Sequence, residues 1–330
     1  MNKAAMERRN ATLDELAEQM LAAKVGKHDS PVNSAPQAKP GGVVAHPDKH
    51  YFSEVLLASA SGIKPVPVSW LWRGWLAAGK MHILAGEAGT GKTTIAMSLA
   101  ATLSSGELWP DGTQAKVGNV VIWSGEDGEE DTLVPRLMAG GADLTRVRFV
   151  TGMADQNGRR AFNPAKDMEP LRRKLLEIGD VSLIVVDPIV SAISGDSHKN
   201  AGVRQGLQPL SDLAEELGAA VLGITHFTKG SQGRNPTERV TGSLAFAAAA
   251  RIVMAAAKRK DAKDGESSRI FCRSKSNLGR DDGGFGYDLI QRNLSHVEIE
   301  ASYVSWGEAV EGTAKKLLHE ADLDARQCSQ

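Results

Sequence analysis

The stretch Gly86-Glu87-Ala88-Gly89-Thr90-Gly91-Lys92-Thr93-Thr94 decides the fold class of this chain. It matches the pattern G-x-x-x-x-G-K-[ST], in which a glycine-rich loop leads from a strand into a helix. The apolar run at 81–85 predicts the strand, and the run at 94–101 predicts the helix. This context favours a phosphate-binding loop over a glycine-rich turn that binds nothing.

The residue types of this loop suit a triphosphate. Glycines let successive backbone N–H groups point at phosphate oxygens, and the helix N-terminus adds partial positive charge. In loops of this kind the lysine, here Lys92, reaches the β- and γ-phosphates, and the hydroxyl of Thr93 is placed to hold Mg²⁺. The whole stretch from Gly86 to Thr94 is therefore a predicted binding site for ATP with Mg²⁺.

The composition is that of an ordinary globular protein. The chain has 330 residues, 42% of them hydrophobic and 24% charged, with a net charge of −1. A charge so close to zero gives no global case for nucleic-acid binding, so any such contact would come from local loops. Cys272 and Cys328 form neither a disulfide framework nor a metal-ligand set, which favours a reducing compartment. Since no apolar stretch is long enough to span a membrane, we expect a cytoplasmic protein without a membrane partner.

The chain divides by composition into three parts. Apolar residues at helical spacing predict one amphipathic helix within residues 1–25, and the Pro- and Gly-rich stretch at 26–50 predicts a flexible linker. We expect a nucleotide-binding domain over 51–305. Residues 306–330 are predicted to form a C-terminal helix and a polar tail.

Strands and helices alternate after the phosphate-binding loop. The predicted strands lie at 117–124, 147–151, 183–187 and 219–225, and the predicted helices at 131–138, 164–178 and 201–217. Four consecutive strands follow, at 252–256, 268–273, 286–289 and 296–304. The expected fold class is therefore α/β, with a mostly parallel central sheet, helices on both faces and a C-terminal antiparallel extension.

Three tryptophans, Trp70, Trp72 and Trp75, precede the first strand of this pattern. They are either an aromatic platform for the nucleotide base or packing residues that cover the sheet. Packing is the favoured interpretation, because tryptophan contributes a large hydrophobic area to protein cores.

Two further strands end in acidic residues. The strand at 183–187 ends in Asp187, the form of a Walker B element whose carboxylate helps hold Mg²⁺. Pro188 follows it, so a water-activating glutamate must come from elsewhere. Glu126, just past the strand at 117–124, is the best candidate and Asp127 the next, because ligands bind beyond the carboxyl ends of such strands. The alternative is a solvated acidic turn that favours a helix N-terminus.

The strand at 220–226 ends in His226, which is placed to donate a hydrogen bond to the γ-phosphate. Polar, locally basic loops follow at 191–205 and 227–242. The alternative interpretation is ordinary solvated loops, because neither has an aromatic stacking series. The candidate nucleic-acid contacts in these loops are Lys199, Lys229, Arg234 and Arg239.

In this order, the motifs resemble the RecA-like ATPase fold, and within it the plasmid RepA-type replicative helicases and related phage and plasmid AAA-type ATPases. The resemblance covers roughly residues 65–305. It is carried by 86–94, Ser124-Gly125-Glu126-Asp127, Val185-Val186-Asp187, 225–230, Gly242-Ser243 with Arg251, and 274–279.

The resemblance implies a ring, a hexamer in that family, with ATP bound between subunits. Within one subunit, it implies that Lys92 and Thr93 bind phosphate and Mg²⁺, that Asp187 assists with Mg²⁺, that Glu126 is the base and that His226 senses the γ-phosphate. Toward the neighbouring subunit, it implies that Arg251 is an arginine finger and that Lys275 is a second cation acting in trans. DnaB-type relatives carry an arginine two residues after that lysine, whereas this chain has Asn277. No recognisable primase or zinc-binding domain precedes the ATPase part.

The resulting expectation is an ATP-dependent DNA helicase or translocase in plasmid or phage replication. Single-stranded DNA is the expected partner, with a primase or initiator protein as a further candidate. One alternative is a RecA-fold DNA-binding or regulatory ATPase that does not unwind. A small-molecule kinase is less favoured, because the sequence has no obvious acceptor lid.

Overall fold

The structure is a computed structural model, and it describes residues 57–322 except 157, 195–199, 229, 232–233, 241–243, 260–261, 263–264 and 296. The chain forms two units, Met1–Lys64 and Pro65–Gln330. In the first, the described residues contain a short 3-10 helix, η1, at Ala60–Gly62. The predicted helix within 1–25 and linker at 26–50 lie outside the described residues. All other elements belong to the second unit.

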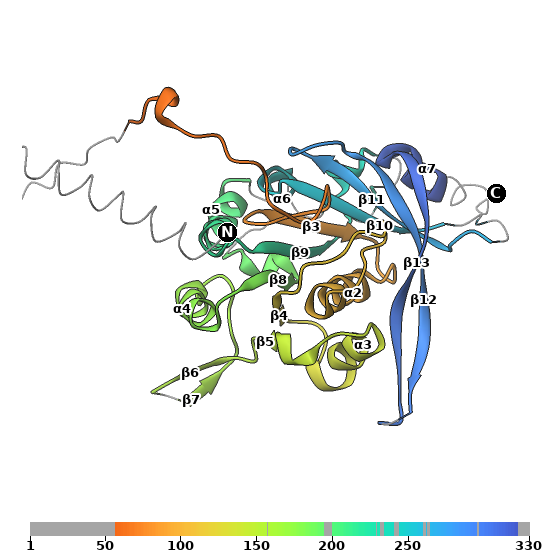
Figure 1. Cartoon of the computed structure of the whole chain (residues 1–330), viewed down its shortest axis with the longest axis horizontal. Helices are drawn as coiled ribbons and strands as arrows, with labels where there is room; N and C mark the ends of the chain where they lie inside the picture. Colours follow the sequence, from red (N-terminus) through yellow and green to blue (C-terminus); the bar gives the residue numbers. More distant parts are fainter. Residues whose placement is uncertain are drawn as a thin grey trace, which may run out of the picture. The chain divides into compact units, whose positions relative to one another are not determined.

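One large sheet forms the centre of the second unit (Figure 1). Its strands are β3 (Met81–Gly86), β4 (Asn119–Ser124), β5 (Val147–Phe149), β8 (Val181–Asp187), β9 (Ala220–His226), β10 (Ile252–Lys258), β11 (Arg269–Ser276), β12 (Asp282–Leu294) and β13 (Ile299–Thr313). Their order is β13-β12-β11-β10-β3-β9-β8-β4-β5. The strands from β10 to β5 pair in parallel, and β11, β12 and β13 add antiparallel pairs.

Helices cover both faces of this sheet. They are α2 (Lys92–Ser105), α3 (Val134–Ala139), α4 (Met168–Ile178), α5 (Asn200–Leu217), α6 (Leu244–Ala249) and α7 (Ala314–Asp322). Shorter helical segments are the π-helix η2 (Glu129–Leu133) and the 3-10 helices η3 (Leu144–Arg146), η4 (Ile189–Ala192) and η5 (Pro236–Arg239). Leu84 of β3 packs with α2 and α3, whereas Ile83 packs with α4 to α7. Strands buried on both faces explain the nearly continuous apolar runs in the sequence. The predicted fold class is confirmed.

The tryptophans lie in the core beside α2. The two short strands β1 (Trp70–Trp72) and β2 (Leu76–Ala77) form a separate small sheet, and Trp75 lies in the turn between them. Trp72 and Trp75 are 1% and 4% exposed, and their rings stack with centroids 4.9 Å apart. Phe271 of β11 stacks on Trp75 at 4.8 Å. These contacts confirm the packing interpretation for Trp72 and Trp75.

The β12–β13 hairpin is longer than predicted and runs past α3 (Figure 1). The sequence predicts a strand that ends at 304 and a helix after 306, but β13 continues to Thr313 and α7 begins only at Ala314. The segment at 305–313 contains two glycines and two glutamates, so it has a weak strand pattern of its own. Antiparallel pairing with β12, from Asp282↔Thr313 onward, determines its conformation instead.

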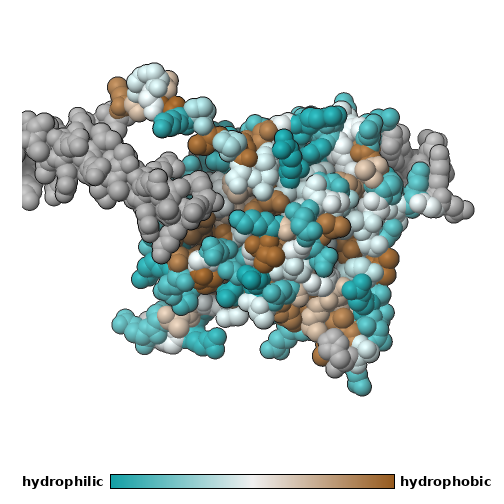
Figure 2. Space-filling view, viewed as in Figure 1, coloured by the Kyte–Doolittle hydropathy of each residue, from teal (hydrophilic) through white to brown (hydrophobic). Residues whose placement is uncertain are grey.

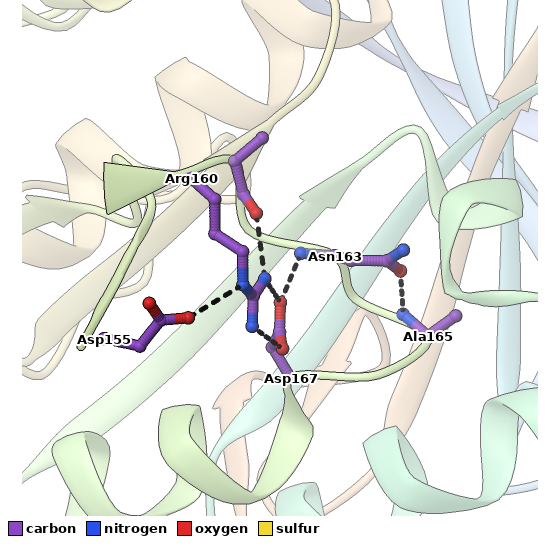
Figure 3. Close-up of polar contacts among 6 residues, drawn as sticks. Asp155, Arg160, Asn163, Ala165 and Asp167 are labelled. Carbon is purple, nitrogen blue, oxygen red and sulfur yellow. Dashed lines mark hydrogen bonds and ion pairs between the residues drawn. The ribbon is translucent and has the colours of Figure 1, made fainter. Parts of the chain in front are cut away.

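A second hairpin, β6 (Met153–Asp155) and β7 (Gly158–Arg160), connects β5 to α4. Arg160, at the end of β7, anchors this hairpin through two hydrogen bonds of 2.7 Å to the buried carboxylate of Asp167 (Figure 3). The same carboxylate accepts the backbone N–H of Asn163 at 2.8 Å. The hydrogen bond from Arg160 lowers the pKa of Asp167, despite the burial of this carboxyl group. The pair therefore fixes the start of α4 by charge-assisted contacts.

On the face drawn in Figure 2, hydrophobic residues lie in small groups among hydrophilic ones, so the coloured residues offer no single continuous apolar surface. Large exposed hydrophobic side chains come from separate segments, such as Leu108, Val117 and Ile290. None of the helices within the described residues combines the length and apolarity needed to cross a lipid bilayer.

Candidate functional site

Four strand ends meet at one edge of the sheet, here called the P-loop edge. Gly86 at the end of β3 is paired with His226 at the end of β9, and Asp187 at the end of β8 with Ser124 at the end of β4. Because these strands are parallel, the loops that follow them emerge on the same side. A cavity of about 210 Å³ lies there, lined by Ala88, Gly89, Gly91, Lys92, Thr93, Thr94, Glu126, Asp127, Arg136, Asp187, Ile224 and His226.

The P-loop has a conformation that requires glycine at two positions. Gly91 has a φ of 87° and is the N-cap of α2, and a Cβ there would lie 2.8 Å from Cδ1 of Leu289. A Cβ on Gly86 would clash with the carbonyl oxygen of Ala256 on the neighbouring strand β10. Thr90 closes the turn by donating its hydroxyl to the Glu87 carbonyl at 2.9 Å. The loop thus brings its backbone and the N-terminus of α2 to the cavity, as anion binding requires.

Lys92 is only 6% exposed and reaches across the loop. Its Nζ donates to the Glu87 carbonyl at 2.9 Å and lies 3.3 Å from Nδ1 of His226. Burial lowers the pKa of Lys92, while the carboxylates of Asp187 and Glu126 oppose this shift. Burial, and then the charge of Lys92, lowers the pKa of His226. A charged Lys92 makes Nδ1 the acceptor, so the proton of a neutral His226 lies on Nε2.

Thr93 and Asp187 form the part of the site that suits a hard cation. The Thr93 hydroxyl donates to Oδ2 of Asp187 at 2.8 Å. Burial raises the pKa of Asp187 to about 6, and the nearby Glu126 and Asp127 charges add to this rise. One hydroxyl and one carboxylate match the oxygen ligands of Mg²⁺, which takes few protein ligands when phosphates supply others. Within the described residues, no cluster of three or more His, Cys, Asp or Glu side chains suited to a metal occurs.

Glu126 and Asp127 occupy different positions in the segment after β4. Glu126 is exposed at the cavity, whereas Asp127 forms a 2.7 Å ion pair with Arg136 of α3. The backbone N–H of Asp127 also donates to the Ser124 hydroxyl at 3.0 Å. Glu126 is therefore better placed to act on a water molecule than Asp127. Sequence reasoning missed Arg136, because an arginine nine residues beyond Asp127 follows neither helix nor strand periodicity.

Arg251 and Lys275 lie at the other edge of the sheet, here called the opposite edge. Arg251 is exposed just before β10, and its backbone N–H donates to the Met81 carbonyl at the start of β3. It borders a cavity of about 440 Å³ that Arg204 of α5 also lines. The length of β3 separates this edge from Lys92 by roughly 16 Å. Arg251 is thus remote from the P-loop of its own chain.

Lys275 makes hydrogen bonds within its own chain, and its role as a second trans cation stays a prediction. Its Nζ donates to the carbonyls of Ala247 and Ala250, at 2.6 and 3.0 Å, at the C-terminal end of α6. Burial lowers the pKa of Lys275, and the charge of Arg251 adds to this effect. Asn277, which stands where DnaB-type relatives have an arginine, donates its backbone N–H to the Arg251 carbonyl at 2.8 Å.

The predicted nucleic-acid residues do not share one environment. Arg234 is exposed. Arg239 is 2% exposed; its guanidinium lies 4.4 Å from the Phe227 ring centroid and 3.4 Å from Oε1 of Glu87 in the P-loop. The charge of Arg239 is thus directed at the P-loop and an aromatic ring rather than at solvent, and a contact between Arg239 and DNA stays a prediction. Lys199 and Lys229 lie outside the described residues.

The chain is similar to a protein-family model and to solved structures. Residues 47–232 match the model of a family described as AAA domain. No curated protein matches the chain significantly. A crystal structure of a KaiC-like protein from the hyperthermophilic archaeon Pyrococcus horikoshii OT3 is 19% identical, with a TM-score of 0.47, covering 72% of this chain and 100% of that one.

The family match spans more than half of the 330 residues and includes the P-loop, Glu126 and Asp187. The chain therefore belongs to the AAA domain family of P-loop ATPases.

Proposed function

We propose that this chain is an ATP-hydrolysing DNA translocase or helicase that works as a ring, a hexamer by resemblance, in plasmid or phage replication. One observation carries the proposal. Lys92, Glu126 and His226 meet at the P-loop edge, whereas Arg251 is exposed at the opposite edge. Two copies placed with the P-loop edge of one against the opposite edge of the next would complete the site. Repetition of that head-to-tail contact closes a ring.

In this proposal, each residue has one task. Lys92 leaves His226 to bind the β- and γ-phosphates of ATP, and Glu126 orients and deprotonates the attacking water. Thr93 and Asp187 would hold Mg²⁺, which when bound neutralises charge on the phosphates. Nε2–H of His226 donates to the γ-phosphate. Arg251 of the adjacent copy stabilises the charge that develops in the transition state.

Contact with DNA would come from the loops that leave the P-loop edge. Arg234 is the exposed candidate in the loop after β9, and Lys199 and Lys229 are candidates by sequence. A net charge of −1 makes a few local cations, rather than the whole surface, the natural contacts for a single strand. A primase or initiator protein is proposed as a partner on the basis of the family resemblance.

The test combines hydrolysis with unwinding. ATPase rates are measured with and without single-stranded DNA, strand displacement is measured on a forked duplex, and mass in solution is measured with and without ATP. Glu126→Gln, which keeps the shape of the side chain, should reduce hydrolysis by about 10²- to 10⁴-fold without loss of ATP binding. DNA-stimulated hydrolysis without strand displacement would contradict a helicase and favour a regulatory ATPase. Hydrolysis that DNA does not change would contradict both.

A further inference from the structure

The P-loop is held from outside the cavity by the β12–β13 hairpin. Tyr287 of β12 is fully buried, and its hydroxyl donates to the backbone carbonyl of Thr90 at 2.6 Å. Two residues further along β12, the Leu289 side chain packs over Gly91. The antiparallel extension of the sheet therefore reaches the middle of the phosphate-binding loop.

The geometry of a peptide unit gives the Tyr287 contact a consequence for phosphate binding. In a planar trans peptide, the carbonyl and the following N–H point in opposite directions. Tyr287 fixes the Thr90 carbonyl on the side of the hairpin, so the N–H of Gly91 is directed to the other side of the loop. Gly91 lines the cavity. An N–H held in this way is preorganised to donate to a phosphate oxygen.

The hydroxyl of Tyr287 remains a donor under all ordinary conditions. Its burial raises the pKa of Tyr287 and so keeps the proton on the oxygen. The ring is fixed by Trp306 of β13, whose centroid lies 6.0 Å away. Trp306 itself donates through Nε1 to the Ser98 hydroxyl on α2 at 3.2 Å. The hairpin thus contacts the loop and the following helix at two separate points.

We propose that Tyr287 is a positioning residue for nucleotide binding: through the Thr90 carbonyl it sets the orientation of the Gly91 N–H and thereby the phosphate affinity of the P-loop. The inference rests on nucleotide binding at this loop, as in the proposed function. It assigns to the C-terminal hairpin a role in a cavity that no described side chain of β12 or β13 lines.

The test measures nucleotide affinity of the full chain. Tyr287→Phe removes the hydroxyl alone, and we expect ATP and ADP affinity to fall about five- to tenfold. Competition by inorganic pyrophosphate, which occupies a phosphate cradle but has no base, should weaken by the same factor. The KM for ATP should rise while kcat changes much less, because Tyr287 does not contact the reacting atoms.

Ser98→Ala is the matched control, because it removes the hydroxyl of α2 that accepts the hydrogen bond from Trp306 of the same hairpin. It should leave ATP and pyrophosphate affinity within about twofold of wild type. Leu289→Ala, at a partly buried position, tests the inference independently if Tyr287→Phe does not fold; it frees Gly91 and should weaken pyrophosphate binding in the same direction.

Two results would overturn the inference: unchanged pyrophosphate affinity in folded Tyr287→Phe, or an equal loss in Ser98→Ala. If Tyr287→Phe is unfolded, unchanged pyrophosphate affinity in Leu289→Ala would do the same. A wild-type chain without affinity for ATP would instead contradict the proposed function.

Discussion

The two edges of the central sheet differ in whether their functional side chains have partners within the same chain. At the P-loop edge, Lys92 contacts His226, and Thr93 contacts Asp187. At the opposite edge, Arg251 is exposed beside a larger cavity, and within the part of the chain that the structure describes its guanidinium has no ion-pair partner. The difference indicates that the first edge is preorganised in cis, whereas the second presents a cation outward. In the proposed ring, the site of the neighbouring copy would use such a cation.

The strongest test of this comparison removes Arg251. Because an arginine finger contributes about 10³- to 10⁵-fold to hydrolysis, Arg251→Ala should lose nearly all ATPase activity but still bind ATP. Mixing it with Lys92→Ala should restore activity, since some interfaces then combine an intact P-loop with an intact Arg251. The steady-state ATPase rate of mixtures measures this effect.

Arg204→Ala is the matched control, because Arg204 is also exposed and lines the same cavity as Arg251. It should keep a rate close to that of the wild-type chain. Mixtures no more active than their separate components would mean that Arg251 does not act on a neighbouring copy, and the contrast between the two edges would lose its functional meaning.

A second test compares two histidines, one near each edge. His82 is completely buried near the start of β3; Nε2 accepts the Ala77 N–H at 3.0 Å, and Nδ1 lies 3.2 Å from the Val221 carbonyl. Burial lowers its pKa to about 4 from 6.5. The unfolded chain therefore binds the proton first, so the stabilisation by neutral His82 is complete above pH 6.5 and is lost as the pH falls towards 4.

Between pH 7.5 and pH 5 the wild-type chain should lose about 2 kcal/mol of unfolding free energy through His82. Urea denaturation at both pH values measures the loss, and His82→Gln should lack this component while being less stable at pH 7.5. His226→Gln is a comparison rather than a silent control: the pKa of His226 is also lowered, so this variant should lose a component of the same sign, and unlike His82→Gln it should also change hydrolysis. Equal pH dependence in wild type and His82→Gln would exclude His82 as the titrating group.

The smallest expected effects separate the two arginines of the loop after β9. Arg234→Gln should weaken single-stranded DNA binding and reduce the salt dependence of that binding by about one ion. Arg239→Gln should instead raise the KM for ATP a few-fold, because Arg239 contacts Glu87 in the P-loop. Binding titrations at several salt concentrations, with ATPase assays, distinguish the two. Reversed effects would mean that the buried arginine, not the exposed one, faces DNA.

Strand-end chemistry was the part of the site that sequence could predict. Asp187 and His226 end apolar strands, Glu126 comes just after one, and Lys92 belongs to the P-loop pattern that follows another. Parallel pairing brings the ends of these strands together at one cavity. The sequence around each of these residues therefore predicts where the residue lies in the fold. The same reasoning predicted the core strands, because burial on both faces requires apolar residues at nearly every position.

Contacts between distant elements were not predictable in this way. Arg136 reaches the cavity from α3, Arg239 turns inward to Glu87, and Tyr287 reaches the P-loop from a strand far along the chain. No periodicity within a segment specifies which segment it will touch. The predicted end of the last strand was wrong for the same reason, because the last residues of β13 adopt a strand conformation only through pairing with β12.

The close approach of Gly86 to Ala256 shows that the first glycine of the P-loop pattern is needed for strand packing, separately from any role in phosphate binding. A side chain at position 86 would collide with the β10 backbone before any nucleotide arrived. The glycine is thus a spacing requirement between adjacent strands. A related protein that no longer binds ATP would still need glycine at this position in order to fold. A glycine there in a related sequence is therefore evidence for the same packing of strands, and not for ATP hydrolysis.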